Sequence, residues 1–102
     1  MWRSSAQTVV FSPIWEDFLS ESEREARRHM RALGEAVRAL REQRTLTGAA
    51  LAAAAGVQPE RIEALEAGEL DPDYELLLAL ARGLGMRAAT LLGHVEALER
   101  EG

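Results

Sequence analysis

The sequence contains no cysteine, which excludes a disulfide framework and any thiolate metal site. It also has no apolar run near the roughly 20 residues that a helix needs to cross a bilayer. The first residues, Met1 to Ser5, lack the apolar stretch of a signal peptide. We therefore interpret the chain as a soluble, cytoplasmic protein without membrane contact.

Lysine is absent as well, so all 12 basic residues are arginines. β-Branched residues are scarce, whereas alanine and leucine, both strong helix formers, are abundant, and this composition predicts an all-α fold. At 102 residues the chain has room for one small domain. The net charge of −5 is unexpected for a nucleic-acid-binding protein, because such proteins usually carry a basic surface.

A long helix is predicted from Ser20 to about Gln43. Ser20 and Glu23 have the spacing of a capping box, in which each side chain satisfies a backbone N–H of the other residue. Apolar residues then recur at alternating steps of four and three, at Ala26, Met30, Leu33, Val37 and Leu40. The stripe suits either the core of one protomer or a seam between two helices, and the sequence leaves both open.

Two short helices are predicted next. Thr47 can cap a helix from Gly48 to Ala55, and Gly56 fits the left-handed residue that ends such a helix. Pro59 suits the first turn of the following helix, which is expected to end at Gly68.

Two further helices complete the chain. The first is expected to be capped by Asp71-Pro72 and broken by Gly83 and Gly85, and the second runs from about Ala88 to Glu99. The residues expected to face inward on these two helices are Tyr74, Leu77, Leu78, Ala81, Leu84, Ala88, Leu91, Leu92, Val95 and Leu98.

Residues 1–29 are predicted to form an N-terminal extension. It contains a strand-like stretch from Thr8 to Phe11, a short helix opened by Ser12-Pro13, and the start of the long helix. Large apolar side chains gather in it, at Phe11, Ile14, Trp15, Phe18 and Leu19. These residues either cover one end of the core or contact a second copy or a partner protein, since aromatic residues dominate interface hot spots.

The two short helices have the features of a helix-turn-helix. Ala52 is small where the following helix crosses it, Gly56 turns the chain, and Ile62 and Leu65 anchor the following helix. The matching run is Leu46-Thr47-Gly48-Ala49-Ala50-Leu51-Ala52, then Gly56-Val57, Ile62, and Leu65-Glu66-Ala67-Gly68, followed by Asp71-Pro72 and Leu76 to Gly85.

On these residues the chain resembles the lambda-repressor-like, or XRE, helix-turn-helix family. The resemblance implies a five-helix domain over residues 30–92, with residues 93–102 ending the last helix. It also implies a buried ion pair between Arg41 and Glu66. Such pairs fix an arrangement more than they add stability, but the loss of one partner typically costs about 3–5 kcal/mol.

For DNA binding, the resemblance places the start of the third helix in the major groove. The matching candidates are Arg61, which can bond guanine, Glu60, which can accept from cytosine, and Gln58. Ala64 occupies a matching position but, like Pro59, has no hydrogen-bonding side chain. The resemblance also places Arg38, Arg44 and Thr47 near the DNA, the two arginines beside its backbone.

The charge distribution argues against ordinary DNA recognition. Seven acidic residues lie between Glu60 and Glu75, against Arg61 alone, and phosphate contacts supply most non-specific affinity. The arginines gather instead on the long helix, as a solvated face, a phosphate-facing surface, or a site for an acidic partner. We therefore expect DNA recognition to be weak or unusual.

Two functional hypotheses follow. The first is a homodimeric regulator of transcription that binds double-stranded DNA and pairs through Leu91, Val95 and Leu98 of its last helix. The second is a protein-interaction module, such as a toxin-binding antitoxin, that captures its partner with Phe11, Trp15 and Phe18 or with its acidic face. No grouping of residues indicates catalysis or a cofactor, and His29 and His94 lack metal-ligand spacing.

Overall fold

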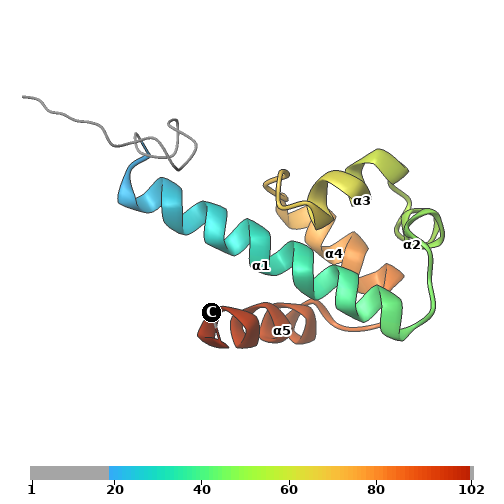
Figure 1. The fold of residues 1–102 in the computed structure, drawn as a ribbon. Helices are drawn as coiled ribbons and strands as arrows, with labels where there is room; N and C mark the ends of the chain where they lie inside the picture. Colours follow the sequence, from blue (N-terminus) through green and yellow to red (C-terminus); the bar gives the residue numbers. More distant parts are fainter. Residues whose placement is uncertain (1–18, 102) are drawn as a thin grey trace, which may run out of the picture.

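The computed structural model describes residues 19–101, and this part of the chain forms five helices and no strand (Figure 1). The helices are α1 (Glu21–Gln43), α2 (Gly48–Ala55), α3 (Pro59–Glu66), α4 (Tyr74–Gly83) and α5 (Ala88–Glu101). The all-α, five-helix fold expected from the sequence is confirmed. The strand-like stretch from Thr8 and the short helix after Pro13 lie outside the described residues.

The start of α1 has the predicted capping box. The Ser20 hydroxyl accepts a hydrogen bond from the Glu23 N–H at 3.1 Å, and the Ser20 N–H donates to Glu23 Oε1 at 2.8 Å. Leu33, Val37 and Leu40 are buried in the core of the same chain. This part of the apolar stripe is therefore core, whereas Ala26, nearer the N-terminus of α1, remains exposed.

The helix-turn-helix lies in α2, α3 and the turn between them. The Thr47 hydroxyl caps α2 by accepting from the Ala50 N–H at 3.0 Å, and Gly56 ends α2 at φ +73°. Pro59 lies in the first turn of α3, as predicted. The side chains of Ile62 and Leu65 are buried beside those of α2, so α3 is fixed to the core along one side.

The start of α4 differs from the prediction. Its cap is Asp73, whose side chain accepts from the Leu76 N–H at 2.8 Å, rather than Asp71-Pro72. The inward side of α4 follows Leu76 and Leu80. Tyr74 and Leu78 lie one helical turn apart on the other side, so the prediction that they face inward is wrong; they are 73% and 37% exposed.

Helix α5 packs on α1 and α4 and lies beside the middle of α1, whose first turns extend beyond the end of α5 (Figure 1). A hydrogen bond between His29 and Glu99 joins the two helices there. Leu91 is fully buried, whereas Leu92 is 42% exposed, because adjacent helical residues point about 100° apart. Among residues 19–101 no single helix is long and apolar enough to cross a membrane; α4 and α5 pass that test only as a pair bent by 98°.

Candidate nucleic-acid interface

A clamp between α1 and α3 fixes the end of α3. Arg41 Nε donates to Glu66 Oε2 at 2.7 Å and Arg41 Nη2 donates to Glu66 Oε1 at 3.0 Å, while Arg41 Nη1 donates to the Leu46 carbonyl at 2.8 Å. The hydrogen bonds that Arg41 donates to the Glu66 carboxylate raise the pKa of Arg41 above its ordinary value. The ion pair that the family resemblance implied is thus present, and it joins α1, α3 and the α1–α2 loop.

Gly34 allows α1 to approach α3 this closely. A Cβ atom at this position would lie 2.5 Å from the Leu65 carbonyl oxygen and 2.8 Å from that of Glu66. Neither backbone oxygen can move without shifting α3. Any larger residue at position 34 therefore separates the two helices, a constraint that no local pattern in the sequence predicts.

The opposite side of α3 is accessible to solvent. Gln58, Glu60 and Arg61 are exposed and Ala64 is half-buried. Gln58 occupies the cap position of α3, but its side chain makes no capping hydrogen bond. Arg61 lines a shallow depression with residues of α4 and its cap, namely Asp73, Glu75 and Arg82. The structure thus places four of the predicted DNA-binding residues on α3 and its cap, three of them exposed at the N-terminal end and Ala64 half-buried in the last turn.

The remaining three predicted DNA-binding residues have structural contacts. Arg38 Nε lies 3.5 Å from Glu66 Oε1, although its side chain is 56% exposed. Arg44 Nε donates to the Leu84 carbonyl at 2.7 Å and its Nη1 donates to the Leu40 carbonyl at 3.2 Å, which ties the end of α1 to the α4–α5 loop. The Thr47 hydroxyl caps α2. Of the two arginines, Arg44 donates two hydrogen bonds to backbone carbonyls, whereas Arg38 has one longer contact to a carboxylate.

Within residues 19–101, side-chain hydrogen bonds or ion pairs involve two of the seven acidic residues from Glu60 to Glu75. Glu66 pairs with Arg41, and Asp73 caps α4. Within residues 19–101 the other five form no ion pair; they are Glu60, Glu63, Glu69, Asp71 and Glu75. Glu63 was not among the predicted site residues, yet it is exposed on α3 one turn from Glu60. Its spacing of three from Glu60 was the signal that could have identified it.

The predicted dimer contact requires a correction. Leu91 and Val95 are 0% and 7% exposed because they pack in the core of their own chain, so they cannot form an interface between two folded copies. Leu98 is partly buried against the same core. Phe11, Trp15 and Phe18, the predicted partner contacts, lie outside the described residues.

Comparison with known proteins agrees with this architecture. The model of the family described as "Helix-turn-helix domain" matches residues 32–94. The chain belongs to this family. It is also similar to the crystal structure of the clp gene regulator ClgR from C. glutamicum, with a TM-score of 0.63 and 32% sequence identity over 68% of this chain and 90% of that one. No curated protein matches the chain.

Proposed function

We propose that this helix-turn-helix protein is a DNA-binding regulator of transcription of the XRE type, acting as a homodimer. The observation that carries the proposal is the placement of α3: Ile62 and Leu65 are buried and Glu66 is clamped, while Gln58, Glu60 and Arg61 remain exposed. A helix fixed in this way can enter a major groove without rearranging. The similarity to ClgR, a regulator of clp genes, supports the same function.

The charges around α3 set the expected mode of binding. Arg61 is the one basic residue of α3, and the same depression contains the carboxylates of Asp73 and Glu75. These carboxylates offset Arg61 and Arg82 of the same depression, and Glu60 and Glu63 of α3 are exposed as well, so the attraction of this surface for phosphates and its non-specific affinity should be low. Sequence discrimination then depends on Arg61, because a bidentate contact with guanine is worth about 1–3 kcal/mol.

The test is selection of binding sites from random duplexes, followed by titration of the selected site at several salt concentrations. Arg61→Ala should weaken binding by about 1–3 kcal/mol and relax the preference at one base pair. Glu75→Gln should strengthen binding by removing a repulsion from phosphate. Arg100→Ala, at the exposed end of α5, is the matched control and should leave affinity unchanged. If selection enriches no sequence and Arg61→Ala has no effect, the proposal is wrong.

Dimerisation is tested separately, by sedimentation with and without the selected duplex. Two copies on one duplex would place their α3 helices at half-sites about one duplex turn apart. A selected site without two related halves, bound by a single copy, would contradict the homodimer but not DNA binding.

A further inference from the structure

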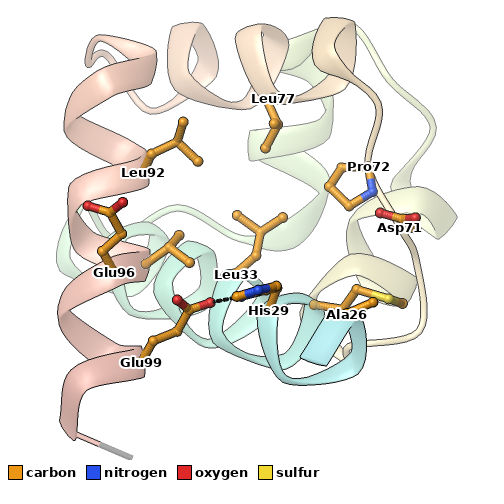
Figure 2. A pocket seen from close by; sticks show the side chains of 11 residues that line it. Ala26, His29, Leu33, Asp71, Pro72, Leu77, Leu92, Glu96 and Glu99 are labelled. Atoms are coloured by element: carbon orange, nitrogen blue, oxygen red, sulfur yellow. Dashed lines mark hydrogen bonds and ion pairs between the residues drawn. The ribbon is translucent and has the colours of Figure 1, made fainter. Parts of the chain in front are cut away.

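An apolar groove lies between the N-terminal half of α1, helix α4 and helix α5 (Figure 2). Its volume is about 410 Å³. Its walls are formed by Met30 and Leu33 of α1, Leu77 of α4, and Leu92 and Val95 of α5. Pro72 forms a further part of the wall, and the rim carries His29, Asp71, Glu96 and Glu99 (Figure 2).

The described part of the chain leaves this groove open. Leu92 is 42% exposed on one wall, and Ala26 is exposed at the end of the apolar stripe on α1. A concave apolar surface with a few polar groups at its rim is the kind of surface that another segment or molecule can bind. The C-terminal part of the stripe is covered by this chain's own core, so the same stripe changes from buried to open along α1.

We propose that the chain's own segment from Phe11 to Phe18 folds back along α1 and fills this groove, with Trp15 as the main anchor. Four of the five aromatic residues of the protein precede residue 19, and the core formed by residues 19–101 contains none. The fifth, Tyr74, is exposed on α4. The segment thus supplies aromatic side chains, whereas the side chains that line the groove are aliphatic or polar apart from His29.

The segment is long enough to reach every part of the groove. The distance along α1 from Ser20 to Leu33, the far wall, is about 20 Å at 1.5 Å per residue. An extended chain from Phe11 to Ser20 spans up to about 30 Å at roughly 3.3 Å per residue. Trp15 itself can reach Ala26 and Met30, at the near end of the groove.

Its charges are compatible with the acidic rim. The segment from Phe11 to Phe18 carries four large apolar side chains and only two carboxylates, those of Glu16 and Asp17. The carboxylates can stay in solvent beyond the rim while the apolar side chains enter the groove. The same rim, with Asp71, Glu96 and Glu99, disfavours an anionic partner or an anionic lipid surface.

Attachment to α1 favours this segment over a second copy of the chain. A segment on a short linker has an effective concentration in the millimolar range, far above the concentration of free protein in a dilute solution. Docking within one chain is therefore expected at concentrations where the protein is monomeric.

The test uses Trp15 as its own reporter in the full-length chain. The protein has two tryptophans, so Trp2→Phe leaves Trp15 as the single tryptophan. Docking predicts a blue-shifted emission and several-fold weaker acrylamide quenching than for free tryptophan, both independent of protein concentration. Leu92→Gln in the groove should shift the emission to the red and increase quenching.

Leu78→Gln is the matched control, because Leu78 is similarly exposed but lies on the other side of α4, outside the groove. It should leave the emission unchanged. Ala26→Glu is a second groove variant at an exposed position and should reproduce the effect of Leu92→Gln, with circular dichroism confirming that the helices are retained.

Three results would overturn the proposal. One is a solvent-like emission of Trp15 in the Trp2→Phe protein. Another is an emission that neither groove variant changes. The third is a blue shift that appears only at concentrations where sedimentation detects a dimer, which would assign the groove to a second copy.

Discussion

The two halves of α1 are held in different ways. The C-terminal half, from Ala32 on, is buried against α3 and α5, and its polar contacts are specific: Arg41 with Glu66, and Arg44 with the Leu84 carbonyl. The N-terminal half carries exposed arginines and one wall of an open groove. The family match begins at residue 32, where this change occurs. The shared domain is therefore fixed by a buried apolar core and by the contacts of Arg41 and Arg44, whereas the turns that precede it are joined to α5 by the His29–Glu99 hydrogen bond and border the open groove.

The strongest test of this difference is Arg41→Ala. It leaves Glu66, whose side chain is 8% exposed, without its bidentate partner and the Leu46 carbonyl without its donor. We expect a loss of about 3–5 kcal/mol in the free energy of unfolding, measured by urea titration. Arg38→Ala removes a longer contact to the same carboxylate from an exposed side chain and should cost less than about 1 kcal/mol. Equal effects of the two variants would show that the clamp is not the specific contact described.

A smaller loss is expected for Gly34→Ala. The new Cβ would meet two backbone oxygens of α3, and overpacking of this kind costs about 1–3 kcal/mol. Part of that loss is offset by the better helix propensity of alanine. Gly93→Ala isolates this second effect, because a Cβ there has no atom within 4 Å and should stabilise α5 by roughly 0.5–1 kcal/mol. The midpoint temperature of thermal unfolding should therefore fall for Gly34→Ala and rise for Gly93→Ala.

A loss of about 1 kcal/mol is expected for Arg44→Ala, since the guanidinium is partly exposed and the lost hydrogen bonds are to carbonyls. Arg28→Ala, on the N-terminal half of α1, should change stability by less than about 0.5 kcal/mol. DNA titration of the folded Arg44 variant shows whether this residue also contacts phosphate. A stability unchanged from the parent protein would mean that the link between α1 and the α4–α5 loop is not needed.

Local sequence signals were sufficient for most helix boundaries. The Ser20–Glu23 capping box, Thr47, Gly56 and Pro59 each act within a few residues, so their effect does not depend on the rest of the fold. The start of α4 was misplaced because Asp71 and Asp73 both have the side chain of a cap. Only the packing of Leu76 and Leu80 on the core selects Asp73.

The candidate DNA-binding surface was predictable as a set of residues but not in its contacts. The match to a helix-turn-helix pattern was enough to name Gln58, Glu60 and Arg61, and all three are exposed. It did not show that Arg44 bonds the Leu84 carbonyl, 40 residues away in sequence, because nothing local to Arg44 encodes that partner.

The sequence by itself determined the helices and the helix-turn-helix, because caps, turns and apolar periodicity are local properties. The tertiary structure decided which side of each helix is inside. Leu91 and Leu92 have the same chemistry, yet one is buried in the core and the other lies on the groove wall. The reason is that the approach of α5 to α1 and α4 selects one direction, and a single helix cannot direct two adjacent side chains to the same place.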